Sequence, residues 1–430
     1  LLFLLLLFLV SNASAQIING LDTLYGNEWI RFDQTYLKIK VGQDGIYRIQ
    51  QAALSNAGVP MAQVSGEQFQ LWHNGEQVPL FVSTSGLLGP SDYLDFFGEK
   101  NTSELDRYLF RNPDSMMINP RYSLVTDTAA YFLSWSNATT GNPRYQATPN
   151  DLSNLPPKED YYLAKLFGNY TNSFQKYYLG QTLSLSEYGQ AEGFASAYAN
   201  SRTFTLQPNA IYPAGPDAQL TLRFTGNAGP HQQAISLNGQ PLLTVDFEQF
   251  QVRNETVTVP IGQVNGTMDI KFQGMLANSD LQRVSNINLQ YPRQFDFENS
   301  SSYAFEIAES SEPKHLEINN FGAVGGQPIL YDLTNRQRMV GIVEGGMVRF
   351  ALPASTSARR LFLVNETTGT LSPNLQPAPF LDFSALDHDY IILTGRQLLG
   401  SGPNQVQAYA DYRASQAGGA FSPIVVEAEQ

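Results

Sequence analysis

Short stretches of alternating apolar and polar residues, separated by turn dipeptides, most constrain the fold of this chain. Residues 36–41 alternate with a period of two, Gln43-Asp44-Gly45 is a turn signal, and an apolar stretch resumes at Ile46. Residues 69–82 repeat the pattern about Asn74-Gly75. Alternation on both sides of such dipeptides is typical of β-hairpins. Similar segments recur as far as residue 364 with no long amphipathic helix, so we expect a mainly β, multidomain, sandwich-like fold.

Two stretches rich in proline and small polar residues divide this β region. A chain of 430 residues is long enough for roughly three domains of about 150 residues each. Residues 142–158 and 373–379 have the composition of linkers. We therefore expect an N-terminal β domain at 16–150, a β-sandwich domain at 151–295, and a small β domain with a linker at 296–380.

The pattern changes near the end of the sequence. Residues 389–394 form a continuous apolar run, residues 404–417 have helical spacing, and residues 423–427 form a second apolar run. This strand–helix–strand order predicts a βαβ unit. Because parallel strands need cover on both faces, we expect 381–430 to be the start of a truncated α/β domain.

The first residues have the pattern of a targeting segment. LLFLLLLFLV is uninterrupted and apolar, and the small residues Ala13 and Ala15 follow it. This predicts a signal peptide at 1–15 with an A-x-A cleavage site. No later stretch reaches the about 18 apolar residues that a transmembrane helix needs. There is no initiating Met or basic n-region, so we expect the natural N-terminus to lie upstream and the mature protein to be exported.

Composition excludes several classes of function. The 42% of hydrophobic residues is too high for a disordered chain. The net charge is −13 and no Lys/Arg cluster is present, which argues against nucleic acid as a partner, because phosphate must be neutralised by cations. The absence of cysteine excludes disulfides, thiolate metal sites and a cysteine nucleophile within these residues.

The order of three groups of motifs is similar to that of a known family. The first is YLKIKV at 36–41 with DGIYRI at 44–49; the second is LWHNGEQVP at 71–79 with DFFG at 95–98. The third is DYIILT at 389–394 with YADYR at 409–413. In this order the chain resembles the gingipain-like cysteine peptidases, and within them the PorU-type sortases of the type IX secretion system.

The resemblance implies a caspase-like α/β domain with a Cys nucleophile activated by a His base. Because the chain has no Cys and no His after His388, no catalytic residue is assigned, and the pair is expected beyond residue 430. The chain alone is expected to be inactive, and we assign no cofactor-binding or metal-binding residue. The parent would cleave C-terminal export signals from secreted protein substrates. Its partners would be these substrates and other proteins of the secretion system, and it would act at the outer membrane, at the cell surface or outside the cell.

A second interpretation remains open, in which the chain is a non-catalytic surface β-sandwich module that binds carbohydrate or a partner protein. Adjacent aromatic residues could form a binding platform, although packing in the sandwich is favoured. These residues are Tyr161, Tyr162, Tyr170, Tyr177 and Tyr178.

The histidines do not form a recognisable site. His388 lies between Asp387 and Asp389, but adjacent residues of an extended chain point to opposite faces. It also precedes its strand, whereas α/β sites form at carboxyl ends. No two histidines have the spacing of metal ligands. We expect structural or solvated roles for His73, His231, His315 and His388.

Overall fold

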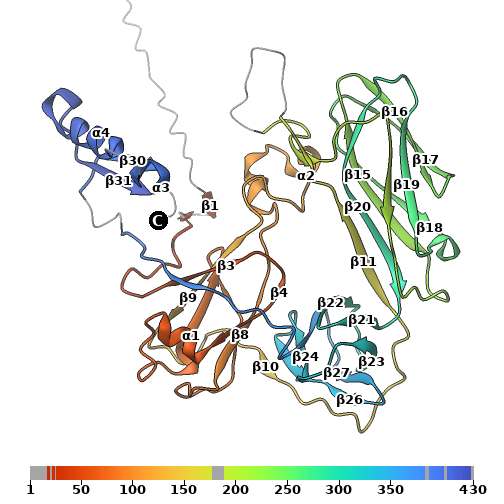
Figure 1. Ribbon diagram of the computed structural model, residues 1–430, viewed down its shortest axis with the longest axis horizontal. Coiled ribbons are helices and arrows are strands. Elements are labelled where there is room, and N and C mark those ends of the chain that lie inside the picture. The colour runs from red at the N-terminus through yellow and green to blue at the C-terminus, as the bar shows by residue number, and fades with distance from the viewer. Residues whose placement is uncertain are drawn as a thin grey trace, which may run out of the picture.

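The structure is a computed structural model that describes residues 17–19, 22–24, 26–176, 188–382, 387–400 and 404–427. The predicted signal peptide, Tyr177 and Tyr178 lie outside the described residues. Figure 1 shows three β-rich units and a smaller α/β unit at the upper left. The fold is therefore mainly β, followed by an α/β unit, as the sequence patterns predicted.

The first β unit contains a five-stranded sheet in the order β29-β3-β9-β5-β6, in which β29 is Leu375–Pro377, and a three-stranded sheet in the order β4-β8-β7. Asn74 and Gly75 adopt positive φ angles of 49° and 84°, which confirms the predicted hairpin between β5 and β6. The hairpin predicted about Gln43-Asp44-Gly45 was wrong, because β3 pairs with β9 and β29 whereas β4 pairs with β8 in the other sheet. The elements are β1 (Ile17–Asn19), β2 (Asp22–Leu24), β3 (Leu37–Val41), β4 (Gly45–Gln50), α1 (Gln51–Asn56), β5 (Phe69–His73), β6 (Glu76–Val78), β7 (Phe81–Val82), β8 (Tyr93–Gly98), α2 (Pro113–Met116) and β9 (Ala129–Trp135).

The second unit is a sandwich of two antiparallel sheets, in the orders β11-β20-β15-β18 and β14-β19-β16-β17. Alternate residues of its strands face a core that includes Phe224 and Phe272, which contact each other edge to face. Its strands are β11 (Tyr162–Asn169), β12 (Ser173–Gln175), β13 (Gly193–Ala195), β14 (Ser201–Leu206), β15 (Ala218–Gly226), β16 (Pro230–Leu237), β17 (Gln240–Glu248), β18 (Arg253–Val259), β19 (Met268–Gly274) and β20 (Gln282–Arg293).

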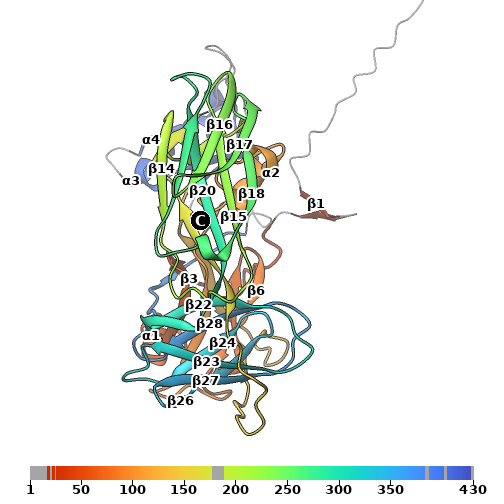
Figure 2. The same ribbon diagram turned by 90° about the vertical axis from the view of Figure 1, so that its right-hand side faces the viewer.

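The third β unit lies below the sandwich in Figure 2 and shares a continuous hydrophobic core with it. Its sheets have the orders β10-β25-β24-β28-β22 and β21-β23-β27-β26. Its strands are β10 (Gln146–Ala147), β21 (Asp296–Ser300), β22 (Ser302–Ile307), β23 (Lys314–Phe321), β24 (Pro328–Asp332), β25 (Gln337–Val340), β26 (Ile342–Glu344), β27 (Met347–Leu352) and β28 (Arg359–Asn365).

Both stretches with linker composition contribute strands that tie the units together. β10 pairs with β25 of the third unit, and β29 (Leu375–Pro377) pairs with β3 of the first unit. The chain thus leaves the first unit after β9 and returns to it about 240 residues later. The boundaries at residues 150, 295 and 380 stay predictions.

The α/β unit contains the expected strand–helix–strand order. β30 (Tyr390–Thr394) pairs in parallel with β31 (Pro423–Glu427), and α4 (Gln405–Ala414) connects them. A short helix, α3 (Arg396–Gly400), precedes α4. Ile391 and Leu393 of β30 point to one face of this sheet and are 65% and 70% exposed. None of the helices in the described part of the chain is both long and apolar enough to cross a bilayer.

Candidate functional site

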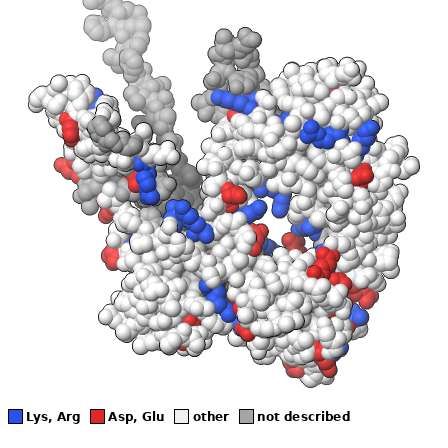
Figure 3. Space-filling model, viewed as in Figure 1, with Lys and Arg blue, Asp and Glu red and all other residues white. Residues whose placement is uncertain are grey.

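Two adjoining clefts lie between the sandwich and the third unit, and the smaller one also reaches the first unit; we call them together the central cleft. Their volumes are about 770 Å³ and about 410 Å³, and Tyr162, Leu163 and Glu306 line both. Figure 3 shows the surface hollowed at this place, with acidic and basic residues gathered in the hollow. A concave site at an interface of units is where ligands preferentially bind.

Edge strands of two different sheets form the walls of the central cleft. β11 ends one sandwich sheet, and β22 ends the five-stranded sheet of the third unit. Lys165 Nζ lies 2.6 Å from Glu306 Oε2, and the hydroxyl of Tyr162 donates to that of Tyr303 at 3.2 Å. These contacts hold the two edges beside each other without sheet pairing between them.

One wall of the cleft combines apolar side chains with a cation. Leu163 and Phe167 lie on the same face of β11, since they are four residues apart, and are 42% and 37% exposed. The guanidinium of Arg121 lies 3.6 Å from the ring centroid of Phe167. Burial lowers the pKa of Arg121, although Asp44 acts in the opposite direction. The Arg121 guanidinium has no hydrogen-bond or ion-pair partner among the described residues, so its donors are available to a carboxylate.

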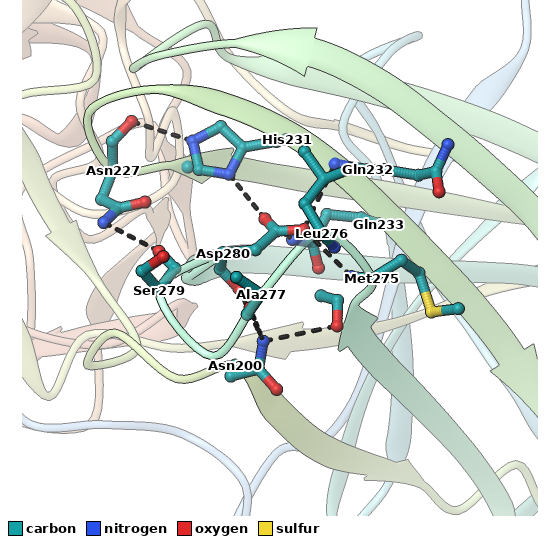
Figure 4. Close-up of polar contacts among 12 residues, drawn as sticks. Asn200, Asn227, His231, Gln232, Gln233, Met275, Leu276, Ala277, Ser279 and Asp280 are labelled. Atoms are coloured by element: carbon teal, nitrogen blue, oxygen red, sulfur yellow. Dashed lines mark hydrogen bonds and ion pairs between the residues drawn. The ribbon is translucent and has the colours of Figure 1, made fainter.

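A second polar cluster is buried at one end of the sandwich (Figure 4). His231 Nδ1 lies 2.7 Å from Asp280 Oδ1, and His231 Nε2 lies 2.9 Å from the carbonyl of Asn227. Gln233 Nε2 also donates to Asp280 Oδ1, at 2.7 Å. His231 and Asp280 are each 3% exposed, so neither reaches solvent easily.

The Asp280 carboxylate organises the loop that follows β19. Its Oδ2 accepts hydrogen bonds from the backbone N–H groups of Gln232, Met275 and Leu276. Burial alone would raise the pKa of Asp280, but the bonds from His231 and from the backbone outweigh it, and the pKa is lowered. Both nitrogens of His231 face acceptors, the Asp280 carboxylate and the Asn227 carbonyl, and neither contacts a nucleophile among the described residues. The cluster therefore holds the loop in place and lacks the parts of a catalytic dyad.

His388 does not form a reacting centre with its acidic neighbours. Its Nδ1 lies 3.1 Å from the carbonyl of Ser422, while Asp389 Oδ1 accepts from the Ser422 N–H at 2.6 Å. The Ser422 hydroxyl donates to the backbone carbonyl of Asp387 at 2.9 Å. These exposed contacts join the chain before β30 to the chain before β31, at the amino ends of the strands.

The other histidines are separated from one another. His73 stacks on Tyr131, with ring centroids 4.1 Å apart, and its Nδ1 contacts the carbonyl of Ala130. His315 is buried, and its Nε2 lies 3.7 Å from Glu317 Oε1. Within the described residues, no group of three acidic, histidine or cysteine side chains could hold a metal ion.

The tyrosines considered as a platform lie in different surroundings. Tyr161 lines the larger cleft and stacks on Tyr212, with ring centroids 5.1 Å apart. Tyr162 is largely buried in the core, and Tyr170 packs on Phe204. Among the three described tyrosines of this group, Tyr161 alone lies both at a cleft and in a stack.

Sequence analysis did not identify Arg121 or Phe167. The two residues are 46 positions apart, and their contact depends on how the first unit meets the sandwich. The alternation within β11 gave a usable signal for Phe167, because Leu163, Lys165 and Phe167 share a face. Nothing in the sequence pattern singled out Arg121.

Comparison with solved structures reveals a likeness over most of the chain. The crystal structure of dimeric latent PorU from Porphyromonas gingivalis matches with a TM-score of 0.57 and 13% identity, covering 92% of this chain. The match covers 37% of the PorU chain, so this chain spans little more than a third of its length. The likeness shows a shared fold.

Carbohydrate-binding modules match a smaller part of the chain. CBM36 in complex with calcium and xylotriose has a TM-score of 0.19 and 17% identity over 29% of this chain and 98% of its own. CBM35 from Cellvibrio japonicus Abf62 has a TM-score of 0.20 and 12% identity over 30% of this chain and 97% of its own. No protein-family model matches the chain, and no curated protein matches its sequence.

Proposed function

We propose that this chain is the β-rich part of an exported, PorU-like cysteine peptidase that acts as a sortase of the type IX secretion system. The fold shared with PorU over 92% of the chain supports the architecture. The activity, cleavage of C-terminal export signals from secreted cargo, is inferred from the motif resemblance. The β units would serve as a scaffold, and the α/β unit would join a larger catalytic domain.

The exposed face of β30 carries this proposal. Ile391 and Leu393 are 65% and 70% exposed, although their strand pairs in parallel with β31. Parallel strands occur almost only in sheets that are covered on both faces. Burying a Leu or Ile side chain completely contributes about 1.5–3 kcal/mol. Covering the two with further polypeptide would therefore contribute roughly 2–4 kcal/mol, which favours the docking of additional α/β structure on this face.

The chemistry of the proposed peptidase must come from residues outside this sequence. The 430 residues contain no cysteine. In the proposed catalytic domain, a His would take the proton from a Cys thiol, and the thiolate would attack the scissile carbonyl. The chain's own contribution would be to hold that domain and to be exported with it.

The natural length of the protein and its reactivity test the proposal together. We expect the intact protein from its native source to be substantially longer than 430 residues and to contain a cysteine that reacts with a peptidyl chloromethyl ketone. The 430-residue chain serves as the matched control and should not be labelled. A native mass that corresponds to these residues alone would contradict the peptidase proposal.

The central cleft favours a second function, in which the chain binds a partner protein. Exposed Leu163 and Phe167, next to the unpaired guanidinium of Arg121, suit a segment with apolar side chains and a carboxylate. A photo-crosslinking residue at position 163 should capture such a partner on whole cells. Arg121→Ala should reduce the yield, and an equal yield from that variant would contradict this role.

A further inference from the structure

A separate cleft lies on the outer face of the five-stranded sheet of the first unit, and we call it the indole cleft. Its volume is about 440 Å³, within the range of small-ligand sites. Strands β5 and β6, the segment 28–34 and the loop 136–138 supply its walls. It is independent of the central cleft and of the exposed face of β30.

Two tryptophans form the aromatic part of the indole cleft. Along β5, Phe69 and Leu71 are buried in the core, so Gln70 and Trp72 point to the outer face. Trp29 lies beside Trp72, with ring centroids 5.6 Å apart and an angle of 31° between the planes. Both indoles stay partly exposed. They are two of only three tryptophans in the chain.

Other aromatic rings fix the position of Trp29. Its ring lies 5.3 Å from that of Phe132 and 5.5 Å from that of Phe380. Tyr36 contacts it edge to face at 5.6 Å. A ligand would therefore meet an ordered aromatic surface and would lose little affinity to ordering it.

Amide side chains contribute to the polar part of the indole cleft beside charged ones. Gln77 lies directly opposite Trp72 in the hairpin, and its side chain has no hydrogen-bond partner among the described residues. Gln70 uses its Nε2 to bond Asn142 at 2.9 Å, which leaves its carbonyl oxygen available. A carboxamide offers both donors and acceptors. The remaining polar lining residues are Glu28, Arg31, Asp33, Gln34 and Ser136.

We propose that the indole cleft binds a neutral saccharide. One face of a pyranose ring presents C–H groups that pack on the electron-rich face of an indole. The hydroxyls of the sugar both donate and accept, which matches the carboxamides of Gln70 and Gln77. Arg31 is the only basic residue in the lining and acidic residues accompany it, so the cleft lacks the cations that a nucleotide or a polyanionic glycan requires.

Tryptophan fluorescence of the full 430-residue chain measures this binding directly, because Trp29 and Trp72 lie in the cleft. The probes are cellohexaose, xylohexaose, mannohexaose and maltohexaose. At least one is expected to change the emission saturably, with a Kd below about 1 mM. Trp72→Ala and Gln77→Ala are each expected to weaken that binding roughly tenfold, by loss of ring stacking or of a hydrogen bond.

Trp135→Phe is the matched control, because Trp135 packs on Phe69 and does not line the cleft. This variant should bind as the unmodified chain does. Gln77→Ala removes a partly exposed side chain that has no hydrogen-bond partner among the described residues, so it tests the cleft even if Trp72→Ala fails to fold. A lack of saturable binding for all four probes, or unchanged affinity in folded Gln77→Ala, would overturn the proposal.

Discussion

Replacing Asp280 by Asn should lower the opening free energy at one end of the sandwich, although Asn has nearly the same shape as Asp. Every group that contacts the Asp280 carboxylate is a hydrogen-bond donor. Oδ1 faces His231 and Gln233, whereas Oδ2 faces three backbone N–H groups. In the better orientation the Asn oxygen would keep the three backbone N–H groups, and its NH₂ group would face His231 and Gln233. His231 can accept from that group as its Nε2–H tautomer, so the Gln233 donor is the one that loses its acceptor.

The expected size of the effect follows from the number of orphaned donors. Each buried donor that loses its acceptor costs about 1–3 kcal/mol. One such donor, Gln233, gives a loss of about 1–3 kcal/mol in the opening free energy of this part of the sandwich. Hydrogen exchange of β16 and β19 is the suitable assay, because a chain with several units does not unfold in one two-state step.

The effect should depend on pH with a definite sign. The pKa of Asp280 is lowered in the folded state, so its carboxylate stabilises the fold above the unfolded value of about 3.9. That stabilisation is lost as the pH falls through the folded pKa. The difference between Asp280→Asn and the unmodified chain should therefore be constant above about pH 5 and shrink below about pH 4.

An exposed aspartate of the neighbouring strand provides the control. Asp269 accepts one side-chain hydrogen bond, from Thr205 at 2.6 Å, and its variant Asp269→Asn should change the opening free energy by no more than about 0.5 kcal/mol. A loss below about 1 kcal/mol in Asp280→Asn, or a loss that persists unchanged in acid, would refute the reasoning.

Three further predictions concern other parts of the chain. Asp95→Ala removes the fully buried carboxylate that binds Arg48 with two bonds of 2.8 Å, and should cost about 3–5 kcal/mol by hydrogen exchange of β8; a loss below about 1 kcal/mol would contradict it. Leu393→Ser should lower the binding of a hydrophobic dye without speeding hydrogen exchange of the β units, and unchanged dye binding would contradict the exposure of this side chain. Gly274→Ala should speed hydrogen exchange of β19, because a Cβ there would lie 2.2 Å from the carbonyl oxygen of Asp280; unchanged exchange would contradict this.

Local patterns were sufficient to predict most strands. Alternation with a turn dipeptide predicted the hairpin of β5 and β6, and helical spacing with a preceding apolar run predicted β30 and α4. These signals depend only on neighbours in the sequence, because the side-chain periods of strands and helices differ. They do not specify which strands pair over long distances.

β29 illustrates that limit. It contains Pro377, lies between Pro373 and Pro379 and belongs to a stretch with the composition of a linker, yet Leu375 pairs with Ile39 at the edge of the first sheet. Proline is tolerated there because an edge strand needs only one row of hydrogen bonds. The partner strand lies more than 300 residues earlier, so tertiary contacts decide the pairing.

The candidate sites were less predictable than the strands, because they combine residues that are distant in sequence. Trp29 and Trp72 are 43 positions apart, and His231 and Asp280 are 49 apart. The result for His388 could be predicted from the sequence, because the question concerned only its neighbours Asp387 and Asp389. In an extended chain the side chains of adjacent residues point to opposite faces, so the three do not converge.

The α/β unit and the β units differ in how completely they bury their apolar residues. The β units contain continuous cores with fully buried rings such as Phe272 and Phe350. In the described part of the α/β unit, the buried apolar side chains are Ala410 and Val426 alone. A two-stranded sheet with so little burial gains too little hydrophobic stabilisation to offset the entropy of ordering its residues. We infer that the unit gains its stability by docking, and the exposed Ile391 and Leu393 mark the face on which that docking would bury most apolar surface.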